Sequence, residues 1–396
     1  MPSLQSRGLF WVYALSAAVY FNQGIEGLPS QGLFYYLKET LKFSPEKIMF
    51  LTSIATFAWL VKPLIGYAID NFLSKKLWIC FALIFNTAMV MVIGTVNLPL
   101  AALIAVLLFN STGAAFRDVA ADGIMCVEGK NYNTTGKIQS VQWIALSVSG
   151  LLTGIAGGYI AQKWDYKIGF LWLIPFYASA LVIAFFYRQS PQIEGHGQKK
   201  YALKELKHLL LNKQLMFTAL FIFLYQFSPS FGTPLFFIQR DTFGWDKIWI
   251  GTLGTIGMVF RIIGAVFYYK FSQRINIKKW IYISVFVGAT TTLSYLYYTP
   301  LTAVIYEIIY SFLGMFIFIM LLDLMARKTA KGFEATSFAL LCSFSNLALT
   351  AGNLSGAFLL PKLGLKSLIV ISSLSSFLCL TLINKIHEPA HADAKQ

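Results

Sequence analysis

Residues 77–96 read LWICFALIFNTAMVMVIGTV, a predominantly apolar run without a charged side chain. A helix of about 20 such residues crosses the roughly 30 Å hydrocarbon core of a bilayer. Similar runs follow one another along the 396-residue chain, which is 57% hydrophobic and only 12% charged. The sequence therefore predicts an all-α membrane protein. It excludes a disordered chain, a collagen-like fibre, a small disulfide scaffold and a DNA-binding domain.

Twelve runs are long enough to be membrane-spanning helices. They cover residues 8–37, 46–71, 75–96, 99–126, 136–162, 166–188, 213–240, 246–272, 277–298, 300–327, 332–360 and 365–386. We expect the first span to be broken or bent near Pro29 and the seventh near Pro229. Proline removes a backbone donor and clashes with the preceding helical turn.

An even number of spans places both termini on one side of the membrane. If that side is the cytoplasm, the inner segments hold 20 Lys and Arg residues and the outer loops hold 9. Basic residues favour the cytoplasmic side, so we predict cytoplasmic termini. The same bias accounts for the net charge of +15 without a nucleic-acid partner.

The two halves of the chain resemble each other. A shift of 200 residues places Pro29-Ser30-x-Gly32 on Pro229-Ser230-x-Gly232. We predict an N-terminal six-helix half (1–188), a cytoplasmic linker with an amphipathic helix (189–212) and a C-terminal six-helix half with a short tail (213–396). Two such halves, related by a pseudo-two-fold axis, form the major facilitator fold, whose substrate site lies between them near the bilayer midplane.

Carboxylates inside the spans are expensive and therefore informative. Asp118 and Asp122 are four residues apart in span four, so they share one helical face. Two carboxylates this close repel each other in a low dielectric, which favours proton binding by one of them. Glu26 lies beside Pro29, where the helix is loosened. We predict that Asp118, Asp122 and Glu26 couple transport to protons. The alternative is that they only form ion pairs between helices.

Basic side chains in the spans suit an anionic substrate. Lys62 and Arg261 occupy similar places in spans two and eight, and Arg117 precedes Asp118. We predict substrate contacts for all three, with charge balance as the alternative.

The loop after span two resembles the gate motif of the major facilitators. It reads Gly66-x-x-x-Asp70, followed by Lys75 and Lys76. An Asp in this motif can meet the positive N-terminal end of a helix. We predict gating roles for Gly66 and Asp70, and for Asp323, the repeat mate of Asp122.

Several stretches together resemble the folate–biopterin transporter family of the major facilitators. They include Trp59-Leu-Val-Lys62-Pro63, Asp118-Val-Ala-Ala-Asp122, Gln139-x-x-Gln142-Trp143, Lys331-Gly332-Phe-Glu334-Ala335-Thr336 and Ser343-x-Ser345-Asn346. The resemblance adds Glu334 to the gate. The expected substrate-binding set becomes Glu26, Lys62, Arg117, Asp118, Gln142, Arg261, Ser343 and Asn346.

The resemblance implies import of folate or a related pterin by alternating access. A pterin edge presents two adjacent N–H donors, which a carboxylate can accept as a pair, and Asp118 is the first choice for that role. Moving an anion against the membrane potential costs about 2.3 kcal/mol per charge per 100 mV, which proton symport would offset. The short loops favour a bacterial inner membrane.

Two alternatives stay open. The solute could be another one, such as S-adenosylmethionine, a muropeptide or a different organic anion, or the protein could be a non-transporting receptor of the same fold. No Walker loop, nucleophile elbow or metalloprotease spacing occurs, so we expect no enzymatic activity. The 4 Cys residues form no C-x-x-C and the 4 His residues lie in a loop or the tail. We therefore expect no metal and no cofactor. We also expect a monomer.

Overall fold

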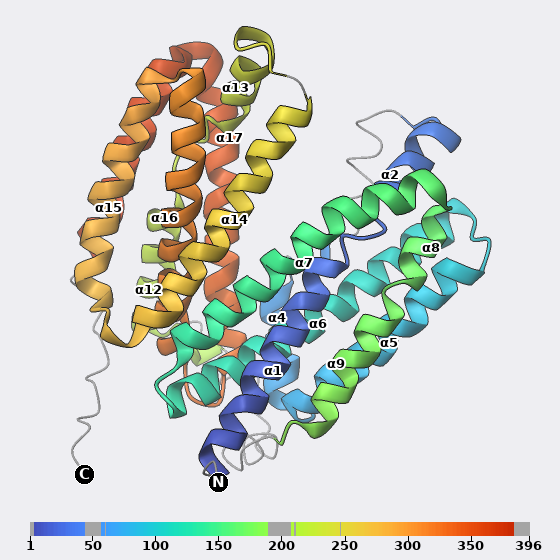
Figure 1. Cartoon of the computed structure of the whole chain (residues 1–396). Coiled ribbons are helices and arrows are strands. Elements are labelled where there is room, and N and C mark those ends of the chain that lie inside the picture. The colour runs from blue at the N-terminus through green and yellow to red at the C-terminus, as the bar shows by residue number, and fades with distance from the viewer. Residues whose placement is uncertain are drawn as a thin grey trace, which may run out of the picture. The chain divides into compact units, whose positions relative to one another are not determined.

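The computed structural model describes residues 4–43, 57–59, 61–188, 207–209, 211–245 and 247–383 (Figure 1). The chain divides into two compact units. The first unit comprises Met1–Ala202 and Thr329–Ala339, and the second comprises Leu203–Lys328 and Leu340–Gln396. All the regular elements of the described residues are helices.

The first unit is a helical bundle. Its elements are α1 (Leu4–Ile25), α2 (Ser30–Tyr35), the π-helical turn η1 (Tyr36–Thr40), η2 (Phe57–Trp59), α4 (Lys62–Asn71), α5 (Lys75–Thr95), α6 (Leu100–Asn131), α7 (Thr135–Lys163), α8 (Tyr166–Leu171) and α9 (Ile174–Phe186). Residues 117–126 of α6 are all buried, and α6 packs against α1, α4, α5 and α7. Charged side chains on this stretch therefore point into protein.

The second unit is also helical. Its elements are α12 (Lys213–Gln226), α13 (Gly232–Phe237), the π-helical turn η4 (Ile238–Thr242), α14 (Lys247–Phe271), η5 (Ser272–Arg274), α15 (Ile277–Ser294), η6 (Tyr295–Tyr297), α16 (Pro300–Arg327), α17 (Glu334–Ser375), η7 (Ser376–Cys379) and α18 (Leu380–Ile383). The first turn and a half of α17, up to Ala339, belongs to the first unit. Gly364, with φ of 74°, kinks α17.

Both predicted proline breaks are confirmed. α1 ends at Ile25 and α2 begins at Ser30, while α12 ends at Gln226 and α13 begins at Gly232. The second break rests on a glycine face of α17, because the amide of Ser230 donates to the carbonyl of Gly352 at 2.9 Å. Small residues on one helix let the irregular backbone of another approach closely, so freed backbone groups find partners.

Seven helices in the described part of the chain are long and apolar enough to cross a membrane. They are Lys75–Thr95, Leu100–Asn131, Tyr166–Phe186, Thr252–Arg274, Pro300–Arg327, Glu334–Gly356 and Phe358–Ile383. Much of the predicted span 46–71 and most of the predicted linker helix lie outside the described residues.

Candidate functional site

A buried ion pair joins α4 to α6. The ammonium of Lys62 lies 2.6 Å from Asp118 Oδ2, and the two side chains are 11% and 5% exposed. The ammonium also lies 4.3 Å from the centre of the Trp59 ring, a cation–π contact. Lys62 is the first residue of α4 and is followed by Pro63, which is favoured at a helix start. The start of α4 thereby sets the position of the ammonium.

Asp122 lies one turn further along α6 and has a different partner. The hydroxyl of Tyr20, on α1, donates to Asp122 Oδ1 at 2.6 Å. The amide of Gln142, on α7, is next to this carboxylate. Gln142 is fully buried, and its side-chain oxygen has no hydrogen-bond partner among the described residues. Buried amide oxygens without partners are rare. The cluster of Lys62, Asp118, Asp122 and Gln142 therefore has polar capacity that the described chain does not use.

Arg117 points into a second buried group. Its Nη2 lies 2.6 Å from Glu26 Oε1, and Nη1 donates to Asn86 Oδ1 at 3.3 Å. The hydroxyl of Tyr177 donates to the same Glu26 oxygen at 2.8 Å. Arg117 is 1% exposed. The pair connects the broken end of α1 to α5, α6 and α9, whereas Asp118 pairs with α4. The substrate-binding roles predicted for Arg117 and Glu26 remain predictions.

Predicted site residues of the second unit have dissimilar surroundings. Asp323 is fully buried and bound by Arg327 at 2.8 Å and by the hydroxyl of Tyr268 at 2.8 Å. Arg261 on α14 and Asn346 on α17 are exposed, and Ser343 is partly buried. Asp323 thus has a structural pairing of its own within this unit.

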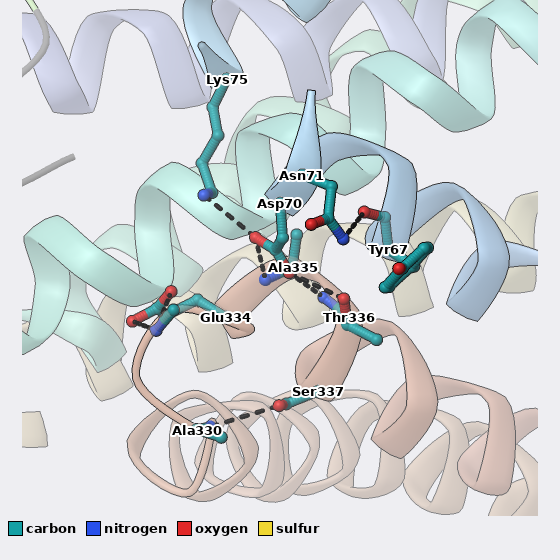
Figure 2. Close-up of polar contacts among 10 residues, drawn as sticks. Tyr67, Asp70, Asn71, Lys75, Ala330, Glu334, Ala335, Thr336 and Ser337 are labelled. Carbon is teal, nitrogen blue, oxygen red and sulfur yellow. Dashed lines mark hydrogen bonds and ion pairs between the residues drawn. The ribbon is translucent and has the colours of Figure 1, made fainter. Parts of the chain in front are cut away.

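Figure 2 shows the polar contacts around Asp70, the ninth residue of α4. The carboxylate accepts hydrogen bonds from the amides of Ala335 at 3.3 Å and Thr336 at 2.8 Å, and from Thr336 Oγ1 at 2.8 Å. The ammonium of Lys75 lies 3.0 Å away, and the Asp70 side chain is fully buried. We call Asp70, Lys75, Ala335 and Thr336 the latch. The first amides of a helix have no partner within it and favour a negative charge. Asp70 supplies the start of α17 with a hydrogen-bond acceptor for its amides and with a negative charge.

Two other predicted gating residues adjoin the latch. A Cβ atom on Gly66 would lie 2.7 Å from the Cα of Thr336, so the close approach of α17 to α4 requires a glycine there. Both carboxylate oxygens of Glu334 accept the amide of Gly332 at 3.0 Å, which holds the turn before α17. The structure therefore brings Gly66, Asp70 and Glu334 together in the first unit. Asp323 lies in the second unit.

Comparison with known proteins identifies the family of this chain. Residues 23–395 match the model of the BT1 family. The chain belongs to the BT1 family. The family resemblance of the sequence motifs is thereby confirmed.

This BT1-family chain is similar to two transporters of known name. It is 26% identical over 403 residues to the folate-biopterin transporter of Synechocystis sp. (strain ATCC 27184 / PCC 6803 / Kazusa), covering 93% of this chain and 80% of that one. It is 21% identical over 389 residues to folate transporter 1 of Plasmodium falciparum (isolate 3D7), covering 89% of this chain and 73% of that one.

A solved structure gives the fold. The major facilitator superfamily proton:xylose symporter XylE matches with a TM-score of 0.73 at 12% identity, over 97% of both chains. At this identity the likeness concerns the fold alone. The expected major facilitator fold is confirmed for this BT1-family chain.

Sequence reasoning missed several partners of the charged residues. Tyr20, Asn86 and Tyr177 supply hydrogen bonds to the buried charges of this BT1-family chain, and Trp59 contacts Lys62. Trp59 lies in a stretch that already carried the family resemblance. The other three are polar side chains in apolar runs, a signal shared with many residues that have no such role.

Proposed function

We propose that this protein is a secondary active transporter that imports folate or a related pterin by proton symport and alternating access. Family membership and the major facilitator fold support the coarser statement, a multi-pass membrane transporter. The names of the relatives support a folate-like or pterin-like solute. The observation that carries the proposal is the buried cluster of Lys62, Asp118, Asp122 and Gln142.

The cluster suits a solute with both N–H donors and an anionic tail. Asp118 can accept paired N–H donors of a pterin edge, a charge-assisted arrangement. In the structure Lys62 occupies one oxygen of that carboxylate at 2.6 Å. A solute that takes over Asp118 would release the ammonium of Lys62, which then becomes available to a carboxylate of the same solute. Gln142 adds an amide whose oxygen is an unused acceptor among the described residues.

The same cluster suits proton coupling. Among the described residues, two buried carboxylates, Asp118 and Asp122, accompany one ammonium, that of Lys62. One negative charge is left with a neutral partner, the Tyr20 hydroxyl. An uncompensated buried charge is costly, and binding a proton removes it. Glu26 is proposed as a further proton site, because protonation would release Arg117 from its ion pair.

The latch is proposed as the cytoplasmic gate. Gly66 and Asp70 hold the start of α17, Glu334 holds the turn before it, and Asp323 is proposed to act on the same side from the second unit. We place the protein in the bacterial inner membrane, as a monomer with both termini in the cytoplasm. No cofactor, metal or enzymatic step enters the proposal.

Uptake into proteoliposomes tests the proposal. Labelled folate, a reduced pterin and S-adenosylmethionine are offered with an inward proton gradient to the wild type, to Asp118→Asn and to Asp165→Asn, a control on the exposed start of α8. We expect folate or pterin to accumulate with the wild type and the control, and not with Asp118→Asn. Failure of both solutes to accumulate would overturn the substrate class. Accumulation that survives collapse of the proton gradient would overturn symport.

A further inference from the structure

The residue of α6 that packs against Lys75 and Ala335 of the latch is a glycine. Gly123 directly follows Asp122 and is buried. A Cβ atom at this position would lie 2.7 Å from Cε of Lys75, 3.1 Å from its Cδ and 3.1 Å from the Cβ of Ala335. Non-bonded carbon atoms are usually about 3.5–4.0 Å apart. The stem of Lys75 therefore passes over Gly123 on its way to Asp70, through space that any side chain would fill.

We propose that Gly123 is a positioning residue for the latch. Its missing side chain lets Lys75 reach Asp70 and lets the first turn of α17 rest against α6. The inference rests on the proposed function only where the latch is called a gate. The contacts of Gly123 with Lys75 and Ala335 are within the first unit.

A methyl group added at position 123 would displace the side chain of Lys75 more easily than the surrounding backbone. The atoms that it would meet on Lys75 are near the end of a flexible side chain, which can rotate away. Asp70, whose side chain is fully buried, then loses its ammonium and keeps only the donors of α17. Losing one partner of a buried ion pair is costly, whereas the same pair in water contributes little. The closed latch is therefore destabilised more than the open one.

Amide hydrogen exchange measures this opening without any solute. The amides of Ala335 and Thr336 donate to Asp70, so their exchange requires the latch to open. In protein reconstituted into phospholipid nanodiscs, we expect peptides covering residues 330–340 to exchange at least about tenfold faster in Gly123→Ala, given the usual cost of an unpaired buried charge. Exchange in the rest of α6 should be unchanged.

Two further variants isolate the lysine. Lys75→Ala should accelerate exchange in the same peptides, and adding Gly123→Ala to it should cause little further acceleration, because the stem that the methyl group displaces is gone and only the 3.1 Å approach to the Cβ of Ala335 remains. Gly288→Ala is the matched control, since a Cβ atom at that position meets nothing within 4 Å. It should leave residues 330–340 as in the wild type.

Several outcomes would overturn the proposal. They are unchanged exchange in Gly123→Ala, acceleration spread over all of α6, and full additivity of Gly123→Ala with Lys75→Ala. If Gly123→Ala alone does not fold, folding of the double variant supports the collision with Lys75, and failure of both variants contradicts it. Because no solute is present, a negative uptake experiment leaves this result unaffected.

Discussion

Lys62 and Asp118 form a buried ion pair in which each charge compensates the other. Both are largely buried, at 11% and 5% side-chain exposure. Removing one partner of such a pair leaves an uncompensated charge, whereas removing both charges can be nearly neutral. The double change should therefore cost less than the sum of the two single changes.

We expect Lys62→Ala to lower the free energy of unfolding by about 3–5 kcal/mol, and Lys62→Ala with Asp118→Asn to recover a large part of it. Thermal unfolding followed by tryptophan fluorescence measures both. Lys163→Ala, at the exposed end of α7, is the control and should change little. With Asp118→Asn measured alone as well, a loss in the double variant equal to the sum of the two single losses would show that the two side chains are not energetically coupled.

The individual site residues were only partly predictable. Asp70 could be assigned to a helix N-terminus because Gly66-x-x-x-Asp70 resembles the gate motif of the major facilitators. The partner of Arg117 could not be assigned, because Glu26 is 91 residues away and the rotation of α1 about its axis decides the contact. Charge balance suggested Lys62 or Arg261 as the partner of Glu26, whereas the structure pairs Glu26 with Arg117.

At the scale of elements, the glycines of α17 determine how tightly the broken seventh span can pack. A Cβ atom on Gly356 would collide with the backbone of Ser230, whereas one on Gly314 of α16 would meet nothing within 4 Å. The glycine spacing was visible in the sequence as a close-packing pattern. Its partner, the non-helical segment between α12 and α13, was visible only as Pro229.

We expect Gly356→Ala to destabilise the protein by about 1–3 kcal/mol, the usual cost of overpacking. Gly314→Ala should be neutral or slightly stabilising, because alanine is the better helix former by about 0.5–1 kcal/mol. Melting temperatures of the two purified variants in one detergent make the comparison. Equal losses for both would contradict a specific contact at Gly356.

At the scale of the whole molecule, the fold class followed from the apolar runs, because bilayer thickness fixes the length of a spanning helix. The proline breaks and the repeat were also readable. Helix ends were less so. The predicted span 332–360 begins two residues before α17, whereas its predicted separation from the span 365–386 is confirmed, because the non-helical backbone of Gly364 divides α17 into two helices. The apolar pattern shows where a span can lie, but it does not determine the exact first residue of the helix.

The charge distribution predicts the orientation in the membrane. A green fluorescent protein fused after residue 396 should fluoresce, and alkaline phosphatase at the same point should be inactive, because the twelve predicted spans place 20 of the basic residues on the side of the termini and 9 on the other. Phosphatase fused to the loop near Lys163 serves as the opposite control and should be active. The reverse pattern would refute cytoplasmic termini.

The latch has a consequence for mutational tolerance. Asp70 binds two backbone amides of α17, and only one of its contacts there is with a side chain, that of Thr336. Backbone donors are present whatever residue occupies the position, except proline, which has none. A genetic screen should therefore find loss-of-function changes concentrated at Asp70 and rare among replacements of the buried Thr336 by residues of similar or smaller size, with Thr336→Pro as the expected exception. The contact therefore depends on the identity of residue 70, which supplies a side chain, and much less on the identity of residue 336, which supplies mainly its backbone amide.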